Sequence, residues 1–205
     1  MAALTRADAE TFARCMAVQG VAVFPADTVY GLACEPSSKE AARRLYALKH
    51  RRPDQPSAVL FFQPSLALAA LPELGPRTRD ALLALLPGPV TLLLANPAGR
   101  FPVACAADTS VLGLRVPALP PAVAALEAVR WPVLQSSANL SGEPEALRLA
   151  DVAPALRAGA DLVLDGGELP GVASTIVDLT DYESAGVWTV VREGALAAGA
   201  VAAAL

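Results

Sequence analysis

The sequence is poor in the residue types that build disulfide frameworks and metal sites. Its 205 residues include one histidine, His50, and only three cysteines, at positions 15, 34 and 105. The cysteines are odd in number and form no C-x-x-C pair, so neither a disulfide framework nor a zinc site is supported. A nucleophile–His–acid triad would have to use His50, which lies within a run of basic residues. We therefore expect chemistry that needs no such triad and no structural metal.

Long apolar runs and leader-like segments are also lacking. No run approaches the roughly 18 uninterrupted apolar residues of a membrane-spanning helix, and the alanine-rich tail 195–205 is too short for one. Asp8 and Glu10 come early, where a secretory leader would carry a basic and then an apolar stretch. We expect a cytoplasmic protein that makes no membrane contact.

Positive charge is scarce, with 16 basic residues against 20 acidic ones and a net charge of −4. This balance argues against a surface devoted to nucleic acid. Six of the basic residues nevertheless fall between residues 39 and 52, and they include both lysines of the chain. A local basic cluster on an acidic protein favours a small anionic ligand over a long polyanion.

Apolar runs and helical patterns alternate along the chain, which predicts a single α/β domain over residues 1–205 around a largely buried sheet. A first helix should begin near Thr5, a second should be capped by Ser37-x-x-Glu40, and a third should cover 77–86. The pattern leaves strand order and oligomeric state open. Strands are expected at 21–25, 58–62, 90–95, 111–116, 132–135, 161–165, 174–179 and 187–192.

Two polar segments in the first third of the chain have both a structural and a functional interpretation. The segment 27–32 directly follows a strand and contains a glycine, so it is either an ordinary turn or a close approach to a ligand. The segment 48–56 carries Lys49, Arg51 and Arg52. Its cations could offset a helix dipole, but they continue into a proline-containing loop, as an oxyanion-binding loop would.

Two further polar segments lie near later strands. In the segment 135–142, the seven residues after the glutamine offer three hydroxyls and an amide, suited either to a polar substrate or to a Ser or Asx turn. The segment 171–175 precedes a strand, and Arg115 and Arg192 each close an apolar strand, at the sheet rim where α/β proteins bind ligands. Neither G-x-x-x-x-G-K-[ST] nor G-x-G-x-x-G occurs. A nucleotide would therefore be bound by side chains gathered from several strand ends.

Taken in order, these segments resemble the YrdC-like family of L-threonylcarbamoyladenylate synthases. The matching stretches are FPADTVYGLAC, ALKHRRPDQP, LLPGPVTLLL, LGLRVP, SSANLSG, ASTIVDL and VVREG. The resemblance implies a single open twisted α/β sheet with helices packed around a basic cavity. It implies a nucleotidyltransferase that joins L-threonine, bicarbonate and ATP into threonylcarbamoyl-AMP and releases pyrophosphate. Mg²⁺ would accompany ATP, and the product would pass transiently to the machinery that modifies tRNA adenosine.

The resemblance also assigns roles to individual residues. The K-x-R and S-x-N pairs imply catalytic roles for Lys49, Arg51, Ser137 and Asn139. ATP-binding roles fall on Arg51, Gln55, Ser137 and Arg192, and threonine-binding roles fall on Thr28, Arg115 and Ser174. Lys49 and Arg51 would neutralise phosphate charge, Arg115 would suit a carboxylate, and Thr28 would bond the threonine hydroxyl.

Three positions depart from the family pattern, and two alternatives stay open. Arg52 stands where proline is usual, Ser57 where leucine is common, and Leu60 where many members place a histidine near threonine. One alternative is a weakly active paralogue that binds tRNA or double-stranded RNA through the basic cavity. The other is a related carbamoyl-transfer domain that cleaves a carbamoyl-adenylate.

Overall fold

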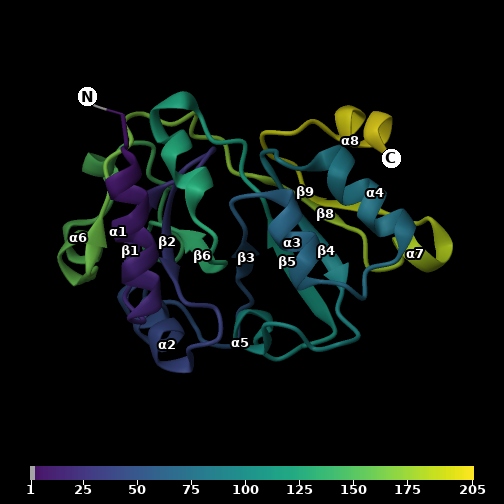
Figure 1. Cartoon of the computed structure of the whole chain (residues 1–205), viewed down its shortest axis with the longest axis horizontal. Helices are drawn as coiled ribbons and strands as arrows, with labels where there is room; N and C mark the ends of the chain where they lie inside the picture. The colour runs from purple at the N-terminus through teal and green to yellow at the C-terminus, as the bar shows by residue number, and fades with distance from the viewer. Residues whose placement is uncertain (1–2) are drawn as a thin grey trace.

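The structure is a computed structural model that describes residues 3–205, and these residues form one open mixed sheet flanked by helices (Figure 1). Its strands are β1 (Ala22–Pro25), β2 (Tyr30–Cys34), β3 (Ala58–Leu60), β4 (Val90–Ala95), β5 (Val111–Arg115), β6 (Val133–Ser137), β7 (Leu162–Val163), β8 (Thr175–Asp178) and β9 (Thr189–Arg192). Their order is β7-β1-β2-β6-β3-β5-β4-β8-β9. Three neighbouring pairs, β1–β7, β3–β5 and β4–β8, run parallel. The predicted open α/β sheet is confirmed.

Most of the helices gather at the two ends of this sheet, whereas α5 packs against the central strands β3 and β5. They are α1 (Arg6–Ala17), α2 (Lys39–Leu48), α3 (Pro64–Ala70), α4 (Pro76–Leu85), α5 (Pro102–Cys105), α6 (Pro154–Gly159), α7 (Tyr182–Ala185) and α8 (Ala198–Ala204), with 3₁₀ turns η1 (Pro121–Ala128) and η2 (Leu149–Asp151). Figure 1 shows α1, α2 and α6 around the β1–β2 end and α4, α7 and α8 around the β8–β9 end. No helix of the described chain has the length and apolar character needed to cross a membrane.

The helix starts follow local capping chemistry. Thr5 caps α1 as predicted, because its hydroxyl accepts from Asp8 N at 3.3 Å while Asp8 accepts from Thr5 N at 2.7 Å. The predicted cap of α2 is wrong by one residue, because Ser38 rather than Ser37 accepts from Ala41 N at 3.2 Å. The neighbouring Ser37 N donates instead to the Glu35 carboxylate in the preceding turn.

Apolar side chains fill both faces of the sheet. The smaller cluster packs α1 and η1 against β1 through Phe12, Phe24 and Phe62, whose ring centroids lie 5.3–6.4 Å apart. The larger cluster covers the opposite face with side chains such as Leu92 and Leu134. Burial on both faces explains why the predicted strands read as continuous apolar runs rather than alternating ones.

The sequence missed one strand and misjudged the length of others. Residues 30–34 form β2 between β1 and β6, although the sequence of the segment 27–32 predicts a turn or a ligand contact rather than a strand. β6 continues through Ser136 and Ser137, so the first residues of the polar segment 135–142 belong to the strand. The strand predicted at 58–62 ends at Leu60, and the one predicted at 161–165 shrinks to two residues.

Candidate active site

A cavity of about 600 Å³ opens over the centre of the sheet, a size typical of small-molecule sites. The sheet forms the floor of the cavity, and small residues leave space above it. Ala58 on β3 and Gly113 on β5 lie side by side there. A Cβ built at Gly113 would meet Ala58 Cα at 3.5 Å, so the missing side chain leaves usable space above the sheet. Side chains from between residues 28 and 192 form the walls.

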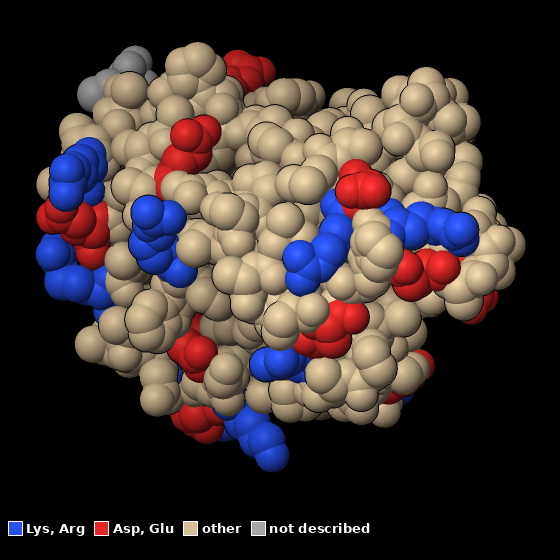
Figure 2. Space-filling model, turned by 45° about the vertical axis from the view of Figure 1, so that its right-hand side comes forward, with Lys and Arg blue, Asp and Glu red and all other residues tan. Residues whose placement is uncertain are grey.

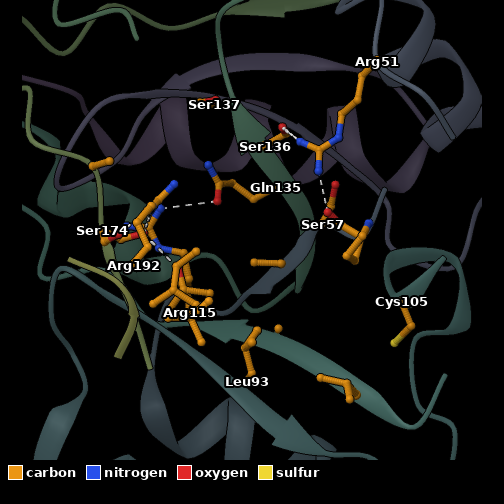
Figure 3. A pocket seen from close by; sticks show the side chains of 18 of the residues that line it. Arg51, Ser57, Leu93, Cys105, Arg115, Gln135, Ser136, Ser137, Ser174 and Arg192 are labelled. Atoms are coloured by element: carbon orange, nitrogen blue, oxygen red, sulfur yellow. Dashed lines mark hydrogen bonds between the residues drawn. The ribbon is translucent and has the colours of Figure 1, made fainter. Parts of the chain in front are cut away.

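The structure brings six of the nine predicted site residues to this cavity. Its lining includes Thr28, Arg51, Arg115, Ser137, Ser174 and Arg192. The other three, Lys49, Gln55 and Asn139, do not line it. Gln55 is exposed on the loop after α2, whereas Lys49 is buried behind the wall and bonds to Asn139. Figure 3 shows Arg51 entering from one side, and Arg115 and Arg192 from the other.

Lys49 fastens the S-x-N segment to the end of α2. Its ammonium donates to the carbonyl oxygen of Ser137, to Asn139 O at 2.7 Å and to Asn139 Oδ1 at 3.3 Å. An ammonium has three N–H donors, so these three acceptors use all of them. Burial, helped by the nearby charge of Arg51, lowers the pKa of Lys49 to about 8.

Arg51 reaches the cavity because the chain turns sharply after α2. His50 adopts a left-handed conformation with φ of 52°, and Arg51 N then donates to Tyr46 O at 2.9 Å. The Arg51 guanidinium donates to Ser136 Oγ at 3.0 Å and to Pro56 O at 2.5 Å, as Figure 3 shows for Ser136. Burial lowers the pKa of Arg51, which nevertheless stays a cation at neutral pH.

Arg115 lies at the bottom of the cavity, only 4% exposed, and is held from two sides. Its Nη2 donates to Asp27 Oδ1 at 2.7 Å and to Thr28 Oγ1 at 3.3 Å, while Nη1 donates to Gln135 Oε1 at 3.4 Å. Burial lowers the pKa of Arg115, and the charge of Asp27 opposes that shift. The second Asp27 oxygen accepts from Ala118 N at 3.2 Å.

The site prediction missed Asp27 and Gln135. Both open motifs that the sequence singled out, DTVYG and QSSANLSG, but neither position shows from sequence alone that it contacts Arg115. The pairing needs three strands side by side, because Gln135 on β6 and Arg115 on β5 flank β3. This arrangement builds a buried Asp–Arg–Gln row along the floor.

Arg192 and Ser174 close the cavity at the β8–β9 end. Arg192 Nη2 donates to Ser174 O at 2.6 Å, and the Ser174 hydroxyl lies 2.9 Å from Thr91 Oγ1. These two residues, 18 positions apart in the chain, therefore lie together at this end of the cavity, and their binding roles stay predictions. Figure 3 shows Ser174 and Arg192 together on the wall opposite Arg51.

The cavity lining is mixed in charge, so a basic cavity stays a prediction. Against its three arginines stand three carboxylates, those of Asp54, Asp108 and Glu145. Among the described residues, no three His, Cys, Asp or Glu side chains converge as a metal cluster.

The basic cluster of residues 39–52 does not form an open positive patch. Arg43 pairs with Glu40 and Arg52 with Asp54, each within its own segment. Arg44 pairs with Asp161 from a distant part of the chain. Lys49 and Arg51 turn inward, and Figure 2 shows basic and acidic side chains interspersed on the face it presents.

Comparisons with known proteins agree with this fold. A family model for Sua5, YciO and YrdC proteins, described as telomere recombination, matches residues 15–194. A threonylcarbamoyl-AMP synthase of Xanthomonas campestris is 37% identical over 159 residues, which cover 75% of this chain and 82% of that protein.

Solved structures superpose over nearly the whole chain. Sua5 of P. abyssi complexed with L-threonine gives a TM-score of 0.85 at 24% identity, covering 98% of this chain and 58% of that one. YciO of E. coli gives 0.80 at 24% identity, covering 98% of this chain and 95% of that one. At this identity the two likenesses establish the fold.

Proposed function

Because this chain belongs to the Sua5/YciO/YrdC family, we propose that it is an L-threonylcarbamoyladenylate synthase. In this proposal it acts as a nucleotidyltransferase on L-threonine, bicarbonate and ATP, and releases pyrophosphate. One observation carries the proposal within the family: three arginines and the S-x-N serine surround one cavity of about 600 Å³. Arginine binds both phosphate and carboxylate through its planar fork, and the substrates carry both groups.

The proposed reaction requires positioning and charge stabilisation rather than a protein nucleophile. The threonine amine and bicarbonate condense to a carbamate with loss of one water molecule, and a carbamate oxygen then attacks the α-phosphorus and displaces pyrophosphate. We assign Arg51 and Arg192 to the phosphates and Ser137 to the nucleotide, because all three side chains reach the cavity. Arg115 with Thr28 is assigned to threonine. Lys49 and Asn139 act behind the wall by holding Ser137: Lys49 donates to the Ser137 carbonyl oxygen, and Asn139 Oδ1 accepts from the Ser137 hydroxyl.

The proposal also includes an ATP contact by Gln55 and a Mg²⁺ ion bound together with ATP. Gln55 is exposed beside the cavity loop, so it would contact ATP only at the mouth. Mg²⁺ commonly binds through one or two carboxylates together with substrate phosphates, and the carboxylates of Asp54, Asp108 and Glu145 reach the cavity. Bound with ATP, the ion would neutralise phosphate charge. We propose that the product then passes transiently to the tRNA-modifying machinery.

A direct assay tests the proposal. The protein is incubated with ATP, Mg²⁺, bicarbonate and labelled L-threonine, and threonylcarbamoyl-AMP and pyrophosphate are measured. Arg51→Ala should lose most of this activity, because each charge-assisted contact contributes about 1.5–3 kcal/mol. Arg43→Ala is the matched control, since Arg43 lies on the outer face of α2 and pairs with Glu40.

Two outcomes would decide against the proposal. Folded wild-type protein without threonine-dependent pyrophosphate release would refute it. Binding of double-stranded RNA with steep salt dependence, in the absence of such turnover, would favour the RNA-binding alternative. Full activity of Arg51→Ala would refute the site assignment while leaving the family unchanged.

A further inference from the structure

Gln135 lies on the cavity floor in an orientation that its neighbour dictates. The residue is 5% exposed on β6, and its Oε1 faces Arg115 Nη1 at 3.4 Å. A guanidinium can only donate hydrogen bonds, so the carboxamide oxygen must be the end that faces Arg115. The NH₂ end of Gln135 therefore points away from Arg115.

This NH₂ group is a free donor in the cavity. Among the described residues it has no hydrogen-bond partner, and it is not one of the sealed, unpaired nitrogens of the structure, which belong to Arg51, Arg115 and Arg157. Gly31 on the adjacent β2 leaves room for it, because a Cβ there would lie 3.0 Å from Gln135 Nε2. A buried polar side chain with an open donor is costly unless a ligand or water satisfies it.

We propose that Gln135 is a substrate-contacting residue that, together with Arg115, binds the carboxylate of the amino-acid substrate. The inference rests on the proposed function and deepens it. Nη1 of Arg115 carries a second N–H besides the one that Gln135 Oε1 accepts, and the Gln135 NH₂ belongs to the same carboxamide, so each side chain can donate to one oxygen of a carboxylate.

The charge of the row favours a singly charged group over a polyphosphate. Asp27 already neutralises much of the Arg115 charge through a buried ion pair, with side chains 3% and 5% exposed. A triphosphate placed here would face a nearly neutral Asp–Arg pair, whereas Arg51 and Arg192 are free of carboxylate partners among the described residues. The floor thus suits a carboxylate, and the walls suit the phosphates.

The substitution Gln135→Glu separates substrate binding from support of Arg115. A glutamate keeps an oxygen for Arg115 and replaces the NH₂ donor by a second acceptor that repels a carboxylate. Gln135→Met removes the donor without adding charge. Gln63→Glu is the matched control, because Gln63 also accepts from an arginine, Arg130, at 3.0 Å but lies outside the cavity.

Calorimetry should compare L-threonine with L-threoninol, which carries an alcohol in place of the carboxylate. In Gln135→Glu we expect threonine affinity to fall by tenfold to a hundredfold, roughly, and in Gln135→Met by about tenfold. Threoninol and ATP affinities should stay within about twofold, as should all affinities of Gln63→Glu. Thermal unfolding verifies that each variant is folded.

Three results would overturn the inference. Equal weakening of threonine and threoninol would make Gln135 a support of the floor only. A lower affinity for ATP alone would show that the Gln135 amide contacts the nucleotide instead. Unchanged threonine affinity in both Gln135 variants would show that Gln135 does not contact threonine. A wild-type protein that binds threonine without turnover would defeat the proposed function but leave this inference standing.

Discussion

The buried ammonium of Lys49 should give the protein a pH dependence of stability that a methionine variant lacks. Its pKa is lowered from 10.5 to about 8, first by burial and second by the charge of Arg51. Between these two pH values the unfolded chain binds more protons at this position than the folded chain. The free energy of unfolding should therefore rise with pH through this window, because deprotonation relieves the cost of the buried charge.

The magnitude follows from the size of the pKa shift. The lowering of the Lys49 pKa from 10.5 to about 8 raises the free energy of unfolding by about 3 kcal/mol over the whole pH window. Between pH 7 and pH 9 the rise is about 1 kcal/mol. For a protein of this length, 1 kcal/mol moves the melting temperature by about 2–4 °C. Lys49→Met should lack this gain. The free energy of unfolding of the wild type minus that of Lys49→Met should therefore rise by about 1 kcal/mol from pH 7 to pH 9.

Activity should respond in the opposite direction. A neutral amine has two donors instead of three, so above pH 8 Lys49 can no longer satisfy all of its acceptors on Ser137 and Asn139. The S-x-N segment loosens, and kcat/KM for ATP should fall while stability rises.

The assay is thermal unfolding of wild type and Lys49→Met at pH 7, 8 and 9, with Lys49→Arg as a variant that keeps its charge throughout. The difference between wild type and Lys49→Met cancels the titration of every other group. Parallel curves for these two proteins would refute the titration of Lys49 in this range. A wild-type kcat/KM that is flat up to pH 9 would refute its role in holding the loop.

Three further substitutions test the floor of the cavity. Gly113→Ala should change the free energy of unfolding by less than about 1 kcal/mol, because its Cβ meets Ala58 at ordinary contact distance, yet calorimetry should show weaker substrate binding. Asp27→Ala should cost about 3–5 kcal/mol in denaturant unfolding, since Arg115 would be left buried without its counter-charge, and a loss below 1 kcal/mol would contradict the ion pair. Thr28→Val should reduce the kcat/KM preference for threonine over valine, and an unchanged ratio would exclude Thr28 as the hydroxyl partner.

The sequence predicts which charged residues end a strand, but it does not predict the direction in which charged side chains point. Arg115 and Arg192 close β5 and β9 as expected, because an apolar run that stops at an arginine marks the sheet rim. The inward turn of Lys49 was not readable, since its acceptors lie 88 and 90 positions away. Arg44 presents the same difficulty, with its partner Asp161 lying 117 residues along the chain.

The missed strand β2 has a physical explanation. All five of its residues are buried, so no alternation of polar and apolar side chains marks it as a strand. Its glycine and the preceding Asp27 and Thr28 are typical of turns. Only pairing with both β1 and β6 defines residues 30–34 as a strand, and those partners are set by the tertiary fold.

The sheet order also determines when a growing chain can first bind its substrates. The residues that line the cavity span positions from Thr28 to Arg192. Strand β8 pairs with β4, and the paired residues Val90 and Thr175 lie 85 positions apart in the chain. Chains fold from the N-terminus as they are synthesised, and such long-range pairings form late. A nascent chain that has not reached Arg192 can bury much of its core and still lack one wall of the cavity. The cavity therefore becomes complete only once β9 has been synthesised, later than most of the core around it.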